Sequence, residues 1–313
     1  MKRVFIDGSA GTTGLRIRQR LSERRDIALT VLPEELRKDE SARRDMLNSV
    51  DIAFLCLPDD AARQAVQLIQ SPSVTVIDTS TAHRTKDDWA YGMPELPGQR
   101  DLIRRSRRIA NPGCHASGFI ALIAPLTAAG LIGADEALHC FSLTGYSGGG
   151  KKMIAEYEAP DRDVLLEAPR IYGLSQAHKH LPEMAKYAGL VSPPAFCPVV
   201  APYYAGMAVT VTLSGAQLKG SPDDIRAVYR AAYPDGLIRY VDSADRNGFI
   251  SAGAMSGRDD MLVTVCGCGE RVQLTALFDN LGKGASGAAI QNMNLVLGLD
   301  ERLGLNCEGA ASV

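Results

Sequence analysis

The opening of the chain combines a short apolar strand, a turn with three glycines and a helix. Residues 4–7 form the strand, residues 8–14 the turn and residues 15–21 the helix. Glycines at such a turn let the backbone approach a pyrophosphate, whose charge the N-terminus of the helix then stabilises. The spacing GxxGxxG differs from the more frequent GxGxxG, but the turn directly follows the first strand of the chain. We therefore expect a dinucleotide site here, with a plain β–α turn as the alternative.

Further strands and helices alternate after this turn. Short apolar strands are expected at 28–32, 52–57 and 74–77, and helices at 40–47 and 61–69. This alternation predicts right-handed βαβ units and a doubly wound parallel sheet. In such a sheet the ligand contacts lie where the strands end. The turn at 8–14 should therefore share a crevice with residues 57–60 and 78–84.

Composition and charge exclude several classes of function. A formal net charge of −2 with 22% charged residues does not indicate a nucleic-acid-binding protein. No apolar run approaches the ~20 residues that a membrane span needs, and the N-terminus becomes polar too early for a signal peptide. Seven cysteines scattered over 313 residues indicate reduced thiols in the cytoplasm. Cys266 and Cys268 form a close pair without further ligands nearby, so we expect no metal site.

Cys114 follows an Asn-Pro-Gly turn and precedes an apolar run of helical character at 119–126. Because Pro112 and Gly113 break the preceding strand, the cysteine should lie in the first turn of a helix. The positive end of a helix favours a thiolate over a thiol. A thiolate there could attack an acyl carbon while neighbouring N–H groups stabilise the oxyanion. The sequence thus predicts a nucleophile, with a buried structural cysteine as the alternative.

Two of the five histidines, His178 and His180, lie two residues apart and are followed by Pro182 and Glu183, which begin an expected helix. Histidine is the usual base and proton shuttle near neutral pH. Zinc binding by His-x-His lacks a third ligand at a plausible spacing. The pair therefore indicates a catalytic base, with structural histidines as the main alternative.

Two segments suit an anionic substrate. Residues 78–84 follow an expected strand and end in Arg84, whose guanidinium fits a phosphate or a carboxylate. The alternative is a plain surface loop. Residues 144–152 form a glycine-rich loop that ends in Lys151 and Lys152 and lacks the spacing of a Walker A motif. This loop is consistent with a lid over an acidic substrate.

The phosphate state of the cofactor depends on Arg37 and Lys38. They follow the strand at 28–32, where an NAD site usually has a lone acidic residue. The basic pair could meet a 2′-phosphate, which favours NADP slightly. Alternatively, the pair belongs to a solvated helix start that Glu34 and Glu35 cap.

The second half of the chain has a different pattern. Strands are expected at 137–143, 207–213, 261–265 and 272–277, and helices at 182–187, after Ser221 and up to Leu297. The pattern indicates an α+β domain with an antiparallel sheet. Glycines at 282, 284 and 287 suit the close approach of the backbone to a cofactor ring. The last helix is expected to return to the first domain.

Six motifs resemble those of the N-acetyl-gamma-glutamyl-phosphate reductase family, in its shorter (type 2) variety. They are ANPGCHASG at 110–118 with Pro125, GSAGTTG at 8–14, STAHR at 80–84, YGMPE at 91–95, SGGGK at 147–151 and HKHLPE at 178–183. The resemblance covers residues 4–292. It implies an α/β fold, with an N-terminal Rossmann domain and an α+β catalytic domain of the glyceraldehyde-phosphate dehydrogenase-like kind. It also implies NADPH as cofactor and a cytoplasmic role in arginine biosynthesis.

The resemblance further implies a reaction and the residues that perform it. The Cys114 thiolate would attack N-acetyl-L-glutamyl 5-phosphate, phosphate would leave, and NADPH would reduce the thioester to the 5-semialdehyde. His178 is the first choice for the acid/base and His180 the second, while Glu183 would orient the histidine or the substrate. Substrate contacts are expected at Arg84, Ser147, Gly148 and Lys151. Cofactor contacts are expected at Gly8, Ser9, Gly11, Thr12, Thr13, Gly14, Arg37, Lys38, Pro58, Ser80, Asn280 and Gly287.

The implied organisation has two domains. Residues 1–113, completed by a C-terminal helix at about 285–313, would bind NADP, and residues 114–284 would serve catalysis and oligomerisation as a dimer or tetramer. Departures from the longer members are His115 for Tyr or Phe, Ser117 for Thr and Ala205 for Arg. An aspartate-semialdehyde dehydrogenase-like enzyme is the near alternative. A Cys-His hydrolase without a redox step is the distant one.

Overall fold

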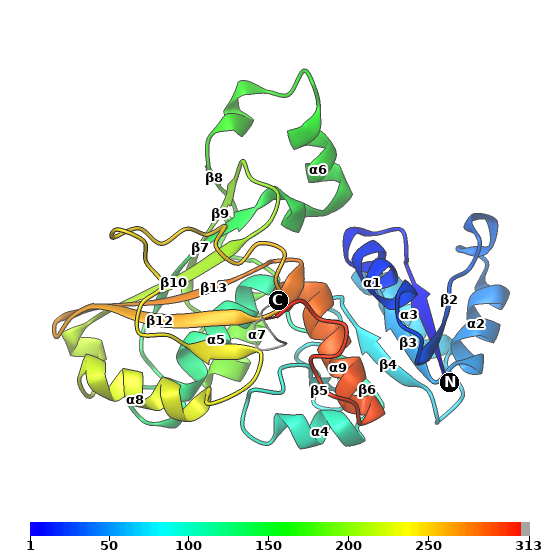
Figure 1. The fold of residues 1–313 in the computed structure, drawn as a ribbon, viewed down its shortest axis with the longest axis horizontal. Coiled ribbons are helices and arrows are strands. Elements are labelled where there is room, and N and C mark those ends of the chain that lie inside the picture. The colour runs from blue at the N-terminus through cyan, green and yellow to red at the C-terminus, as the bar shows by residue number, and fades with distance from the viewer. Residues whose placement is uncertain (308–313) are drawn as a thin grey trace. The chain divides into compact units, whose positions relative to one another are not determined.

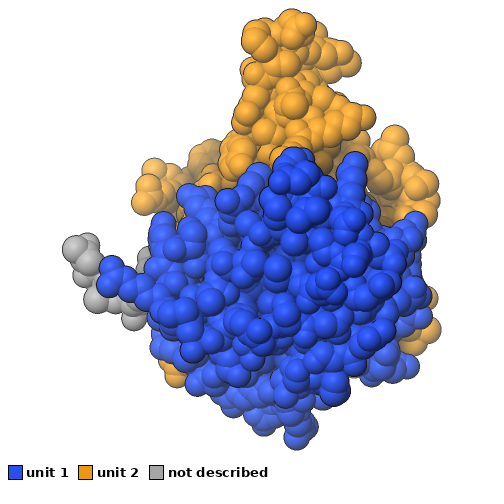
Figure 2. Space-filling model, turned by 90° about the vertical axis from the view of Figure 1, so that its right-hand side faces the viewer, with its two compact units in different colours: residues 1–113, 285–305 blue, residues 114–284, 306–313 orange. Residues whose placement is uncertain are grey.

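The computed structural model describes residues 1–307, which belong to two compact units (Figure 2). Unit 1 comprises Met1–Gly113 and Ala285–Leu305, and unit 2 comprises Cys114–Gly284 and the segment that begins at Asn306. The C-terminal part expected in the first domain, about 285–313, therefore belongs to it only as far as Leu305; its last residues, 308–313, lie outside the described ones. Asn306 joins unit 2 because its backbone N–H donates to Asp259 and its side-chain amide donates to Gly257.

Unit 1 contains a six-stranded parallel sheet in the order β2-β1-β3-β4-β6-β5 (Figure 1). The strands are β1 (Lys2–Asp7), β2 (Ile27–Thr30), β3 (Ile52–Leu55), β4 (Thr75–Asp78), β5 (Ala90–Tyr91) and β6 (Arg108–Ala110). This confirms the predicted parallel sheet. The glycine turn follows β1, Pro58 follows β3 and the segment from Thr79 follows β4, so these three segments leave the same edge of the sheet.

Helices cover both faces of this sheet. One face packs against α1 (Thr12–Ser22), α4 (Gln99–Arg105) and α9 (Gly287–Leu297), and the other against α2 (Glu40–Ser49) and α3 (Asp59–Leu68). Side chains of β1 alternate between the two faces. Val4 and Ile6 point into the core on the side of α1, α4 and α9, and Phe5 points into the core on the side of α2 and α3. Helix α9 contributes Ile290 and Met293 to the same core as Val4 and Ile6. It therefore completes unit 1 from the far end of the chain.

Unit 2 contains a seven-stranded sheet in the order β11-β12-β13-β10-β7-β9-β8. The strands are β7 (His139–Gly145), β8 (Arg170–Ile171), β9 (Ala195–Ala201), β10 (Met207–Ser214), β11 (Ile238–Tyr240), β12 (Met261–Cys268) and β13 (Arg271–Phe278). The expectation of an antiparallel sheet is wrong for two pairs, because β7 with β9 and β11 with β12 run parallel. Each of these pairs is joined by a long crossover rather than a hairpin, which allows parallel pairing.

One face of this sheet is covered by α5 (Cys114–Ala128) and α8 (Pro222–Ala232), and α7 (Leu181–Ala188) packs against α5. Strand β10 alternates accordingly, with Val209 and Val211 buried and Thr210 and Thr212 less so. Helix α5 lies close to the sheet at Gly118, where an added Cβ would come within 2.5 Å of Val209 Cγ2. The side chains of α5 are apolar and buried almost throughout, which fixes the position of its first residue, Cys114.

The glycine-rich segment after β7 differs from the expected loop. Residues Tyr146–Gly149 form a 3₁₀ turn, and α6 (Gly150–Glu158) follows at once, so Lys151 lies in the first turn of a helix. The reason is that Lys, Met, Ala and Glu after the glycines favour a helix. A further 3₁₀ turn, Val164–Glu167, precedes β8. No helix within residues 1–307 is long and apolar enough to cross a membrane.

Candidate active site

The glycine turn of unit 1 is shaped partly by the chain itself. Gly8 has a φ of +87°, and a Cβ there would lie 2.3 Å from the carbonyl oxygen of Cys56. A Cβ on Gly14 would lie 2.5 Å from the carbonyl oxygen of Gly8. Packing of β1, β3 and α1 therefore requires both glycines. The turn would need them with or without a ligand.

Gly11 and Thr12 at the start of α1 are different. A Cβ on Gly11 would make only ordinary contacts, 3.7 and 3.9 Å to the nearest backbone oxygens, so the described chain does not itself require glycine there. Gly11 caps α1 without a side-chain hydrogen bond, and the buried Thr12 Oγ1 has no partner among the described residues. Room for a close approach, a helix N-terminus and an open hydroxyl fit the pyrophosphate of a dinucleotide. Ser9 and Thr13 flank these positions.

Arg37 and Lys38 lie after the 3₁₀ turn Glu34–Leu36, which follows β2. The Arg37 guanidinium forms an ion pair with Glu34, and its buried Nε has no partner among the described residues. Lys38 is exposed. Arg37 has spare hydrogen-bond capacity and Lys38 lies in solvent, and both properties fit a 2′-phosphate. Both residues therefore remain candidates for binding the 2′-phosphate of the cofactor.

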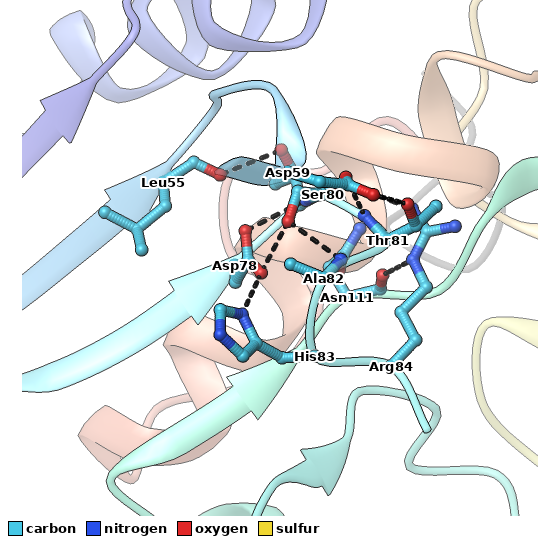
Figure 3. Close-up of polar contacts among 10 residues, drawn as sticks. Leu55, Asp59, Asp78, Ser80, Thr81, Ala82, His83, Arg84 and Asn111 are labelled. Carbon is cyan, nitrogen blue, oxygen red and sulfur yellow. Dashed lines mark hydrogen bonds and ion pairs between the residues drawn. The ribbon is translucent and has the colours of Figure 1, made fainter. Parts of the chain in front are cut away.

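Figure 3 shows a buried polar network after β4. The Asp78 carboxylate accepts hydrogen bonds from the backbone N–H of Ser80 at 2.9 Å and from its hydroxyl at 2.7 Å. His83 Nδ1 lies 2.6 Å from the same carboxylate, and the His83 ring stacks on Trp89 with centroids 4.1 Å apart. Thr81 bonds to Asp59 at the start of α3. The segment is therefore a rigid part of unit 1 and no ordinary surface loop.

Arg84 ends this segment and is 7% exposed. Its Nε donates to the carbonyl oxygen of Asn111 at 2.9 Å, and its Nη2 donates to that of Thr79 at 3.0 Å. Asn111 in turn donates from its amide to Ala285. Arg84 thus supports the turn that precedes Cys114 in the chain. Its expected contact with a substrate anion remains a prediction.

Cys114 is the first residue of α5, where the sequence places it, and is partly exposed. A Cβ on Gly284 would lie 2.9 Å from the Cβ of Cys114. The absence of a side chain at residue 284 therefore leaves space for the cysteine. The N-terminus of α5 favours its thiolate form.

Three histidine rings cluster in unit 2. The ring centroids of His115 and His178 are 5.6 Å apart, those of His115 and His180 5.6 Å, and those of His178 and His180 4.7 Å. Phe196 packs 5.2 Å from His115 and from His178. The structure thus brings together the two expected histidines and the residue that follows Cys114. Within residues 1–307, no three His, Cys, Asp or Glu side chains converge as metal ligands.

The three rings have different environments. His115 is 3% exposed, and burial, with a smaller effect of His178, lowers its pKa to about 3. Both of its nitrogens have partners, Ser142 Oγ at 2.7 Å and Tyr172 Oη at 2.6 Å. His178 is partly exposed, and its Nδ1 accepts from the backbone N–H of His180. Of the three, His178 is therefore the ring with access to a substrate.

The remaining expected residues lie as follows. Glu183 is buried in the first turn of α7, and Lys151 is exposed. Asn280 donates to Ser147 Oγ at 3.0 Å and accepts from the backbone N–H of Gly206 at 2.9 Å, close to Gly148. Asn280 belongs to unit 2, whereas Gly287 begins α9 in unit 1 and Pro58 caps α3 there. Ser142 and Tyr172 were not predicted, because strand alternation does not say which residues face His115.

Two family models match the chain. The semialdehyde dehydrogenase NAD-binding domain matches residues 32–104, and the semialdehyde dehydrogenase dimerisation domain matches residues 114–280. Unit 1 thus contains an NAD-binding domain of this type, and the second match covers most of unit 2. The predicted class of fold is confirmed.

Curated relatives are similar over nearly the whole chain. The chain is 43% identical to the N-acetyl-gamma-glutamyl-phosphate reductase 2 of Nostoc sp., over 97% of this chain and 99% of the relative. It is 46% identical to the N-acetyl-gamma-glutamyl-phosphate reductase of Rhizobium etli, over 94% and 98%.

Solved structures are similar in fold. The aspartate semialdehyde dehydrogenase of Francisella tularensis superposes with a TM-score of 0.70 at 17% identity, over 95% of this chain and 100% of that one. The aspartate semialdehyde dehydrogenase with NADP from Candida albicans gives a TM-score of 0.65 at 17% identity, over 95% and 99%. At such identities these structures support the fold alone.

Proposed function

This chain belongs to the N-acetyl-gamma-glutamyl-phosphate reductase family, and on that premise we propose which of its residues carry out the reaction of the family. The reaction is the reductive dephosphorylation of N-acetyl-L-glutamyl 5-phosphate to N-acetyl-L-glutamate 5-semialdehyde, in arginine biosynthesis. The observation that carries the proposal is Cys114 at the first turn of α5, in the same unit as a cluster of three histidines.

Cys114 is the nucleophile. Its sulfur attacks the acyl carbon of the substrate, the bond from that carbon to the phosphate oxygen breaks, and a thioester forms. The proton of the Cys114 thiol passes to an acid/base group as the thiolate forms and then to the departing phosphate, so the step is balanced. Backbone N–H groups at the start of α5 stabilise the negative charge that develops on the acyl oxygen.

His178 is the acid/base group that moves this proton. The argument is accessibility, because His178 is partly exposed while His115 is buried and bonded at both nitrogens. His180 is buried and is the second choice, and Glu183 in the first turn of α7 orients the pair. Removal of an assisting imidazole should cost about 10²–10⁴-fold in rate.

NADPH is the proposed cofactor, and when bound it supplies a hydride to the thioester carbon. Gly11 and Thr12 fit its pyrophosphate, and Arg37 with Lys38 fit its 2′-phosphate. The other proposed contacts are those of the glycine turn, Gly8, Ser9, Thr13 and Gly14, together with Pro58, Ser80, Asn280 and Gly287. Collapse of the reduced adduct releases the semialdehyde and returns the Cys114 thiolate.

Arg84, Ser147, Gly148 and Lys151 are proposed to bind the substrate. Asn280 donates a hydrogen bond to Ser147, the residue before Gly148, which supports a fixed contact rather than a mobile lid. The oligomeric state and the location are proposals as well. We propose a cytoplasmic homo-oligomer, a dimer or tetramer, formed by the domain at 114–280; sedimentation of the purified protein would measure it.

The proposal is tested by NADPH absorbance with N-acetylglutamyl phosphate, and in reverse with phosphate, NADP and either N-acetylglutamate 5-semialdehyde or aspartate semialdehyde. Cys114→Ser should lose turnover by orders of magnitude and still bind NADPH. Cys268→Ser, which removes an exposed thiol of the same unit, is the matched control. A preference for aspartate semialdehyde would favour the near alternative, and hydrolysis without NADPH binding would favour a Cys-His hydrolase.

A further inference from the structure

Ser142, His115 and Tyr172 form a linear chain of hydrogen bonds in unit 2. Ser142 Oγ in β7 lies 2.7 Å from His115 Nδ1, and His115 Nε2 lies 2.6 Å from Tyr172 Oη. Ser142 is 0% exposed and His115 is 3% exposed. Tyr172, between β8 and α7, is only partly buried. The chain therefore runs from the core to the more open Tyr172.

The two bonds can point in either of two directions. In one, Ser142 donates to Nδ1, and Nε2–H donates to the oxygen of Tyr172. In the other, Tyr172 donates to Nε2, and Nδ1–H donates to Ser142. A neutral imidazole carries one proton, so it cannot donate through both nitrogens or accept at both.

Burial selects the first direction. His115 is the one side-chain partner of Ser142 Oγ among the described residues. If Ser142 only accepted, its own buried proton would have no acceptor, which is costly. If Ser142 donates, its proton is satisfied, and the proton left over is that of Tyr172 at the more open end of the chain.

We propose that His115 is held as the neutral tautomer with its proton on Nε2, and that it turns the Tyr172 hydroxyl into a hydrogen-bond donor toward the acyl group on Cys114. Ser142 and His115 are then positioning residues, and Tyr172 is the group that contacts the substrate. This inference rests on the proposed function, because it assigns a partner to the acyl oxygen. It leaves His178 in the acid/base role.

The charges around Tyr172 agree with this role. Burial raises the pKa of Tyr172 above its usual value, and the negative charge of the nearby Cys114 thiolate raises it further. Tyr172 therefore keeps its proton and stays neutral beside the nucleophile. His115 cannot take that proton, because its own Nε2–H already points at the phenol oxygen. Hydride addition places negative charge on the acyl oxygen, which a preorganised neutral donor stabilises.

The kinetic test compares four single variants and one double variant. Tyr172→Phe should lower kcat by about 10²-fold, the cost of losing one oxyanion donor, with little change in KM. His115→Phe should lower kcat in the same way, and His115→Gln, which keeps an N–H donor, should recover much of the loss. His139→Gln, at an exposed histidine of β7, should not change kcat. The double variant with Phe at 115 and 172 should be no slower than Tyr172→Phe alone.

A second measurement needs no variant in the cluster. Nitrogen-15 NMR of the folded wild-type protein should show the His115 proton on Nε2 and none on Nδ1 near neutral pH. A proton on Nδ1, a wild-type kcat for His115→Phe, or losses that multiply in the double variant would each overturn the inference. Failure of the proposed function would look different, because the wild-type protein itself would then not reduce the acyl phosphate.

Discussion

The hydroxyl of Tyr233 donates a 2.7 Å hydrogen bond to the carbonyl oxygen of Ala121 in α5. In an unbroken helix that carbonyl would accept from the residue four positions later, which here is Pro125 and has no N–H. The hydroxyl of Tyr229 donates in the same way to the next carbonyl, that of Leu122, at 2.6 Å. Tyr233 at the end of α8 therefore replaces the one helical donor that Pro125 removes from the helix that begins at Cys114, and Tyr229 adds a second bond to the same turn.

Tyr233→Phe should lower the free energy of unfolding by about 1–3 kcal/mol, because it leaves the buried carbonyl of Ala121 without a donor. Urea denaturation followed by circular dichroism would measure it. Tyr240→Phe is the matched control, since that hydroxyl bonds to the exposed Asp242 and its loss should cost less than about 0.5 kcal/mol. Equal losses in the two variants would show that Ala121 does not depend on Tyr233.

Gly284→Ala should disturb the nucleophile directly. The added Cβ would lie 2.9 Å from Cys114 Cβ and 3.2 Å from Phe278 Cε2, and overpacking of this kind costs about 1–3 kcal/mol. We expect a lower kcat and slower labelling of Cys114 by iodoacetamide, with NADPH affinity retained.

The labelling is best done with Cys268→Ser as background. Cys268 is exposed, and backbone N–H groups of Glu270 and Arg271 lower its pKa, so it would compete for the reagent. Gly269→Ala is the matched control, because a Cβ there meets open space. Unchanged labelling in Gly284→Ala would mean that Cys114 tolerates the methyl group.

Charge reversal at Arg37 and Lys38 should weaken NADPH binding far more than NADH binding. The reason is that a 2′-phosphate is present in the first cofactor and absent from the second. Titration of cofactor fluorescence with the double variant, both residues changed to Glu, would measure the two dissociation constants. Arg44→Glu, at an exposed arginine of α2, is the control. An equal loss for both cofactors would show that the basic pair only shapes the start of the helix.

His115 should make the fold sensitive to acid. Its pKa is 6.5 in an unfolded chain and is lowered to about 3 by burial in the folded protein. Between these values the unfolded chain binds a proton that the folded protein does not, so stability rises with pH. The contribution is complete above pH 6.5 and is lost progressively as the pH falls toward 3.

His115→Gln removes this titration. The free energy of unfolding of the wild type, relative to that of the variant, should therefore fall by about 2 kcal/mol between pH 7 and pH 5. His139→Gln, at an exposed histidine, should show a constant difference over the same range. Urea denaturation at several pH values measures both. A constant difference for His115→Gln would mean that the folded protein also protonates this ring.

Local patterns predicted the parts of the structure that depend on neighbours in the chain. The strand, glycine turn and helix from Lys2 to Ser22 follow from apolar periodicity and glycine spacing, and so does Cys114 at a helix start. Six short motifs further indicated a resemblance to the reductase family, and relatives of 43 and 46% identity confirm it. The roles of individual site residues remain predictions.

The features of the structure that local patterns did not predict depend mainly on contacts between distant segments of the chain. Tyr172 is 57 residues from His115, and nothing in either segment marks them as partners. The parallel pairing of β7 with β9 depends on the crossover between them, which alternation of side chains does not reveal. Helix α6 was missed because three glycines argue against a helix, although the residues after them favour one.

The place of α9 in unit 1 bears on how the chain folds during synthesis. Its residues Ile290 and Met293 pack on the same face of the parallel sheet as Val4 and Ile6 from β1. During synthesis on a ribosome, that face of the sheet cannot be covered by α9 until nearly the whole chain has emerged. The continuous segment Cys114–Gly284 of unit 2 emerges before it. Unit 1, which contains the first part of the chain to be made, is therefore the last to have a complete core. A chain that stops at Gly284 would leave the face of the parallel sheet that α9 covers exposed.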